Sequence, residues 1–217
     1  MPCMGRGPTV GGMSLIATPA FTVTGRRPRL DPLNWLAGGK ITVACLLASS
    51  FVVPAAGGFH GEALWLRGVV YPVGLIVLPV IWVARGRGRY PLAADAYLLV
   101  PFAFDAAGNS LGLYGRIDNF DNFSHLVGTV ALTGFAGALL ATRSADRLVT
   151  ILAAAGVAAM LGIGIELTEW TAFTHPVATG YGAYRDTVGD LGMDVAGAAL
   201  GAITLWLTNR AATAFDR

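Results

Sequence analysis

Six stretches of this chain are each long and apolar enough to cross a lipid bilayer, which takes about 20 mainly apolar residues per helix. Only 13% of the residues are charged, whereas about a quarter are charged in soluble globular proteins. We therefore predict an all-α fold, a polytopic membrane helical bundle with six transmembrane helices. The predicted segments are about 39–56, 68–84, 92–114, 124–141, 148–173 and 187–208.

The remaining residues indicate one membrane domain with a tail at each end. Residues 1–37 are rich in Gly, Pro, Thr and Arg and lack a periodic apolar face, which is typical of a disordered segment. We interpret them as a basic cytoplasmic tail. Residues 38–210 then form the six-helix membrane domain, and residues 211–217 form a second cytoplasmic tail.

The basic residues predict the orientation, because Lys and Arg concentrate in the cytoplasmic loops of membrane proteins. With six crossings, only Arg67, Arg116 and Arg185 of the 15 Lys and Arg residues fall on the side opposite the termini. We therefore expect cytoplasmic termini and a multi-pass protein of the bacterial inner (plasma) membrane. Membrane lipids are the expected partners, nucleic acid is not, and the sequence specifies no oligomeric state.

The last four apolar segments carry acidic side chains in the half of the bilayer that lies opposite the termini. Ionisable groups are costly in hydrocarbon and therefore mark functional sites. The members of each pair are three or four residues apart, which places both on one helix face. We predict that they meet in one outward-facing pocket. The pairs are Asp105 with Asn109, Asp121 with His125, Glu166 with Glu169, and Asp190 with Asp194.

A divalent cation would offset the negative charge that these carboxylates place in a region of low dielectric constant. Carboxylate oxygens suit Mg²⁺, Mn²⁺ or Ca²⁺, and an added imidazole favours Zn²⁺ or Fe²⁺, so the identity of the metal stays open. The alternatives are shared protons, or pairing with Arg116 or Arg185. The candidate metal ligands are Asp121, His125, Glu166, Glu169, Asp190 and Asp194, with Asp105, Asn109 and Asp186 as supporting polar residues.

Two further features bear on packing. The glycine pairs Gly108-x3-Gly112 and Gly197-x3-Gly201 lie on acid-bearing segments and allow close helix approach. Asp95 lies near the cytoplasmic end of the third segment, and we interpret it as an interfacial charge near Arg89.

Three of these motifs also carry a family resemblance. Asp121-Asn-Phe-Ser-His125, Glu166-Leu-Thr-Glu169-Trp170 and Asp186-Thr-Val-Gly-Asp190-Leu-Gly-Met-Asp194 resemble, in this order, motifs of the YjdF-like family of uncharacterised bacterial inner-membrane proteins. More distantly, the chain is similar to VanZ-like membrane proteins. The resemblance covers about residues 105–203. It implies a multi-helix inner-membrane fold and shared polar positions at the six candidate ligands, and it implies no particular activity.

Three functions are compatible with such a pocket. The first is a metal-dependent membrane enzyme that acts on a lipid-linked or envelope substrate. The second is a proton or divalent-cation transporter, and the third is a structural or regulatory membrane protein. The first two segments carry no acid or base in their apolar interiors, which favours a one-sided pocket over transport. No catalytic residue is assigned, and no nucleotide-binding or nucleophile motif occurs.

Overall fold

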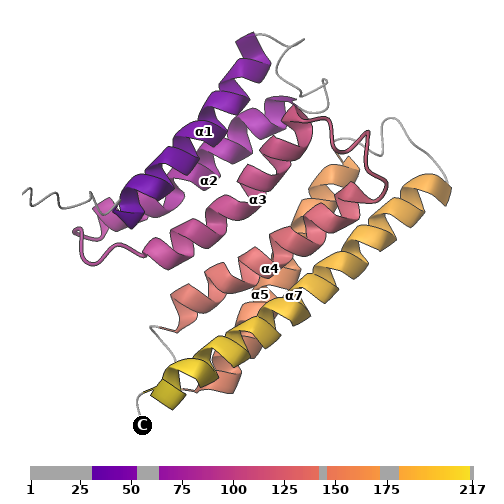
Figure 1. The fold of residues 1–217 in the computed structure, drawn as a ribbon. Helices are drawn as coiled ribbons and strands as arrows, with labels where there is room; N and C mark the ends of the chain where they lie inside the picture. Colours follow the sequence, from indigo (N-terminus) through magenta and orange to yellow (C-terminus); the bar gives the residue numbers. More distant parts are fainter. Residues whose placement is uncertain (1–30, 53–63, 142–145, 172–180, 216–217) are drawn as a thin grey trace, which may run out of the picture. The chain divides into compact units, whose positions relative to one another are not determined.

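The computed structural model describes residues 31–52, 64–141, 146–171 and 181–215, and the long elements in these ranges are α-helices (Figure 1). No strand occurs in the described ranges, which confirms the prediction of an all-α fold for this part of the chain. The helices are α1 (Pro32–Val52), α2 (Leu64–Ala84), α3 (Leu92–Ser110), α4 (Phe120–Leu140), α5 (Arg147–Glu169) and α7 (Tyr181–Phe215).

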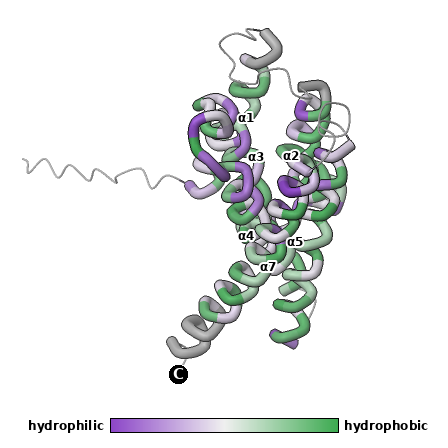
Figure 2. Tube along the Cα trace, turned by 90° about the vertical axis from the view of Figure 1, so that its right-hand side faces the viewer, coloured by the Kyte–Doolittle hydropathy of each residue, from purple (hydrophilic) through white to green (hydrophobic). Residues whose placement is uncertain are grey.

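Within the described ranges, four helices are long and apolar enough to cross a membrane, namely α2, α4, α5 and α7. Figure 2 shows apolar residues, in green, along most of α5. Helices α1 and α3 have 21 and 19 residues, but α1 carries Lys40 and α3 carries Asp95 and Asp105. These ionisable side chains are paired inside the protein, which lowers the cost of placing them in hydrocarbon.

Helix α1 begins at Pro32, inside the predicted tail. The cause is local, because the carboxylate of Asp31 accepts a hydrogen bond from the Leu33 N–H at 3.1 Å and so caps the helix. Proline also suits the first helical position, where its missing N–H costs nothing. The rest of the predicted tail, residues 1–30, lies outside the described residues.

Helix α7 extends beyond the predicted membrane segment at both ends. It begins at Tyr181 rather than at 187, and it continues to Phe215, into the predicted tail. Hydropathy indicates which residues are buried in lipid, whereas a helix continues as long as its backbone hydrogen bonds do. The polar residues that flank the apolar segment therefore gave no signal that they are helical. The predicted segment ends at 56 and 173 lie outside the described residues.

Helix α4 is central to the bundle, since it packs against α3, α5 and α7. Its ring of Phe120 stacks on Phe104 of α3, with centroids 5.4 Å apart. Helices α1 and α2 instead pack against α3 and against each other. The contact between α3 and α4 therefore joins an N-terminal group of three helices to a C-terminal group.

The two predicted glycine pairs have different roles. A Cβ on Gly197 would lie 2.6 Å from the carbonyl oxygen of Leu126, and one on Gly201 would lie 2.5 Å from Thr133 Cβ. These two glycines therefore let α7 approach the backbone of α4. Gly112 instead follows the end of α3 with φ of +65°, a left-handed conformation that favours glycine.

We expect Gly197→Ala to lower the free energy of unfolding by about 1–3 kcal/mol, because the added methyl group collides with the α4 backbone. Gly192→Ala is the matched control on the same helix, since a Cβ there meets no described atom within 4 Å. Alanine at this position should stabilise the helix by about 0.5–1 kcal/mol. Reversible unfolding in mixed micelles measures both changes. Equal effects of the two substitutions would contradict this packing.

Asp95 is a buried ion-pair partner, so its prediction as an interfacial charge near Arg89 was wrong. Its side chain is fully buried, and Lys40 Nζ lies 2.7 and 2.6 Å from its two oxygens. Lys40 also donates to the Leu75 carbonyl at 2.7 Å. That carbonyl lacks its helical donor because Pro79, four residues later, has no N–H. The first two helices therefore do contain a base, contrary to the prediction.

Tyr90, in the turn before α3, supplies another donor to this carboxylate. Its hydroxyl donates to Asp95 Oδ2. Burial, and after it the neighbouring Asp95, raise the pKa of Tyr90, so the hydroxyl stays protonated and remains a donor. The charge of Asp95 is thus compensated entirely within the α1–α3 group.

Candidate metal centre

The imidazole of His125 lies at the middle of the candidate site, near the start of α4. The helix begins at Phe120, after Asn119, which has φ of 61°, a left-handed conformation that Asn tolerates better than most residues. This turn places Asp121, Asn122 and His125 in the first turns of the helix. Asp121 and His125 share one helix face, as their spacing of four residues predicts.

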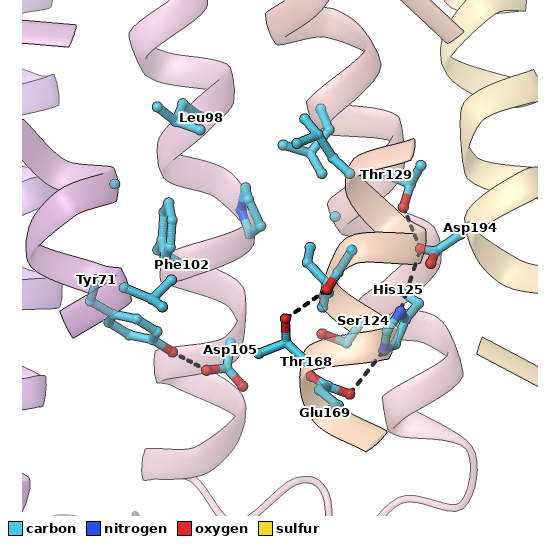
Figure 3. A pocket seen from close by; sticks show the side chains of 18 of the residues that line it. Tyr71, Leu98, Phe102, Asp105, Ser124, His125, Thr129, Thr168, Glu169 and Asp194 are labelled. Carbon is cyan, nitrogen blue, oxygen red and sulfur yellow. Dashed lines mark hydrogen bonds and ion pairs between the residues drawn. The ribbon is translucent and has the colours of Figure 1, made fainter. Parts of the chain in front are cut away.

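One ring nitrogen of His125 contacts a buried carboxylate. Nδ1 lies 3.4 Å from Oδ1 of Asp194 on α7, and the Thr129 hydroxyl donates to the same oxygen at 2.5 Å (Figure 3). Gly162 of α5 makes room for this carboxylate, because a Cβ there would lie 2.5 Å from Asp194 Cγ. A carboxylate accepts a hydrogen bond only from a protonated Nδ1, so in the neutral imidazole Nε2 carries the available lone pair.

The other ring nitrogen of His125 faces two further carboxylates. Nε2 lies 3.6 Å from Oε2 of Glu169 on α5 and 4.0 Å from Oδ1 of Asp121. Histidines that bind metals are usually oriented in this way, with one nitrogen donating to a carboxylate and the other directed at the ion. The geometry of His125 therefore fits a metal ligand.

The candidate residues form two groups that can hold a metal ion, and His125 belongs to both. Asp121 and Asp190 complete the first group, and Glu166 and Glu169 complete the second. Within each group, the ligand atoms lie within 4.8 Å of one another. Ligands on opposite sides of an ion with bonds of ~2.0–2.2 Å are about 4 Å apart, so small side-chain movements would close either group around an ion.

Two carboxylates of the site have an oxygen without a hydrogen-bond partner among the described residues. Glu166 is 5% exposed and Asp194 is 2% exposed, and the oxygens in question are Oε2 and Oδ2. A buried anionic oxygen without a partner is unfavourable, and a cation would satisfy it. Asp190, by contrast, accepts a hydrogen bond from Asn122 Nδ2 at 3.0 Å.

Asp105 belongs to a separate network. Arg67 Nε lies 3.3 Å from its Oδ2, and the Tyr71 hydroxyl donates to the same oxygen. Asn109 Nδ2 and the Tyr114 hydroxyl donate to Oδ1 at 2.8 and 2.9 Å. Because both oxygens have donors, Asp105 and Asn109 support the fold near the site and lie outside both metal groups.

The remaining predicted partners stay at the surface. Arg116 and Arg185, the alternative cations, are exposed, whereas Arg67 pairs with the half-buried Asp105. Asp186 is also exposed and belongs to neither metal group, although it lies one helical turn from Asp190. Of the three predicted acids on α7, only Asp190 and Asp194 are therefore buried.

Tyr114 links the Asp105 network to α4. Its hydroxyl lies 3.2 Å from Ser124 Oγ, next to His125 in the chain. Burial, and after it the charge of Asp105, raise the pKa of Tyr114, so the hydroxyl stays protonated. The network thus ties α3 and its following turn to the part of α4 that carries the imidazole.

Sequence reasoning missed six contributors to these networks, namely Thr129, Asn122, Arg67, Tyr71, Tyr114 and Ser124. Thr129 had a signal, because it lies four residues after His125 and continues the helix face that starts at Asp121. Arg67 and Tyr71 gave none, since they lie 38 and 34 residues from Asp105. Their role depends on how α2 packs against α3.

Comparisons with known proteins agree with a membrane location. Residues 39–211 match the family described as "Predicted membrane protein (DUF2238)". The match spans all six helices, apart from the ends of α1 and α7. Neither the curated proteins nor the solved structures gave a match.

Proposed function

This chain belongs to the DUF2238 family of predicted membrane proteins, and we propose that it is a divalent-cation-dependent membrane enzyme that acts on a lipid-linked substrate. One observation carries the proposal, namely the orientation of His125 between Asp194 on one nitrogen and Glu169 with Asp121 on the other. The unpartnered, buried oxygen of Glu166 supports it independently.

The arrangement suggests a division of roles among the side chains. His125 and Glu169 offer ligand atoms, Glu166 or Asp190 completes the set, and Asp194 orients the imidazole. A bound cation would polarise a carbonyl or phosphoryl oxygen and would lower the pKa of a bound water. A carboxylate that is not used as a ligand is then positioned to accept a proton.

The finer topology follows the same proposal. We infer that α1 and α3 also cross the membrane, which gives six spans with both termini in the cytoplasm of a bacterial cell. The pairing of Lys40 with Asp95 and of Arg67 with Asp105 supports this, because it removes unpaired charge from both helices. The resemblance to YjdF-like and VanZ-like proteins stays a prediction.

Metal analysis of the purified protein tests the proposal. We expect about one tightly bound divalent ion per chain, and an affinity lowered about tenfold in Glu166→Gln. Asp186→Asn is the matched control, because it removes a nearby exposed carboxylate that belongs to neither metal group. A wild-type protein that binds no divalent ion would refute the proposal. Flux of the bound ion through proteoliposomes would instead assign the site to transport.

A further inference from the structure

Four polar side chains of the candidate site, those of Asp121, His125, Glu169 and Asp194, lie at one end of a larger cavity. Its volume is about 580 Å³, within the range of about 300–1,000 Å³ that small-molecule sites have. Helices α2 and α5 line its two sides, and α3 and α4 line its back. Figure 3 shows Leu98 well away from Asp105 and Glu169. The apolar part is lined by residues that include Val70, Val77, Leu98, Phe102, Leu132 and Leu161.

The exposure of lining residues on α2 and α5 indicates that the cavity is open between these two helices. The lining residues Val70 on α2 and Met160 on α5 are 43% and 67% exposed. Both helices are candidate membrane spans. An opening bordered by two spans and by aliphatic side chains faces lipid chains rather than water. A ligand of this cavity would therefore enter sideways from the bilayer.

The charges at the polar end discriminate between lipid head groups. Arg67 offsets Asp105, whereas Asp121, Glu169 and Asp194 add three further carboxylates to the cavity wall. Even with a divalent cation bound to the neutral imidazole of His125, these carboxylates outweigh the positive charges, so no surplus of positive charge remains to attract an anionic head group. A head group without net charge fits this end better.

We propose that the cavity binds one hydrocarbon chain of a membrane lipid without net charge, which enters between α2 and α5 and places its ester oxygens near His125. The chain exchanges one apolar environment for another, so the polar end contributes most of the selectivity. This inference deepens the proposed function and rests on it for the reaction, whereas binding of the lipid rests on the cavity alone.

Filling the cavity from α5 tests the inference. A Cβ on Gly164 meets no described atom within 4 Å although the residue lines the cavity, so Gly164→Leu occupies the space without displacing a helix. Gly156→Leu is the matched control, because Gly156 is equally open and does not line the cavity. The protein is placed in nanodiscs that contain equal amounts of phosphatidylethanolamine and phosphatidylglycerol with identical chains. Native mass spectrometry then measures how much of each lipid the protein retains.

We expect the wild type and Gly156→Leu to retain phosphatidylethanolamine preferentially and Gly164→Leu to retain about tenfold less of it. A second pair of substitutions, on α2, controls for misfolding. Val70→Trp should block the cavity, whereas Val73→Trp should not, because Val73 is exposed and does not line the cavity. If the two variants of each pair retained equal amounts of phosphatidylethanolamine, the cavity would not be the binding site of the lipid. A preference for phosphatidylglycerol would contradict the inference that the polar end favours a head group without net charge.

Removal of divalent ions separates this inference from the metal site. With EDTA present, retention of phosphatidylethanolamine should stay within about twofold, because removal of the cation makes the polar end more negative and so preserves its preference for a head group without net charge. Failure of the proposed function would appear as a protein without metal that still retains the lipid. Failure of the present inference would appear as a metal-loaded protein whose retained lipid is insensitive to Gly164→Leu and Val70→Trp.

Discussion

Lys40→Met is expected to lower the free energy of unfolding by about 3–5 kcal/mol, because it leaves the charge of Asp95 buried without its cation. Asp95 is fully buried, and both of its oxygens accept from the ammonium group. The substitution also removes the donor to the Leu75 carbonyl, which Pro79 leaves without a helical partner. Reversible unfolding in mixed micelles measures the loss.

A double substitution separates the cost of the unpaired charge from the loss of packing. Lys40→Met combined with Asp95→Leu removes both charges, and it should recover most of the stability, since apolar replacements of a buried ion pair are often neutral. Lys40→Met alone should be far worse than the double variant. If the two variants unfold with equal free energies, the ion pair does not stabilise the α1–α3 group.

This ion pair also illustrates what the sequence could not reveal about the fold. Apolar runs were enough to predict an all-α membrane bundle, because burial in lipid depends on local composition. The partner of Asp95 lies 55 residues away, on a helix whose one base was counted among the charges on the side of the termini. Without the packing of α1 on α3, a charge near a segment end is indistinguishable from an interfacial one.

The candidate site was more predictable because its spacings are local. Intervals of three and four residues place Asp121 with His125 and Glu166 with Glu169 on common helix faces, and the structure brings these pairs together. Spacing alone could not divide the acids by role. Asp105 has the same kind of partner as the others, yet its oxygens are occupied by α2 and by Tyr114.

His125→Ala is expected to weaken divalent-metal binding by more than about a hundredfold, because His125 is the one residue shared by both possible ligand groups. Asp194→Asn should weaken binding by about 10–100-fold, since a neutral amide is a weaker acceptor for the Nδ1 proton and supports the imidazole less. Isothermal titration of the metal-free protein with Zn²⁺ and Mn²⁺ measures both effects.

A double-mutant cycle shows whether Asp194 acts through the imidazole. If it orients His125, the variant with both substitutions should bind metal about as weakly as His125→Ala alone, because the carboxylate no longer has a ligand to position. If Asp194 serves only to stabilise the bundle, its replacement should lower the unfolding free energy and leave the affinity of the folded protein unchanged. Independent, additive losses of affinity would instead place Asp194 directly on the ion, where its unpartnered Oδ2 could reach it.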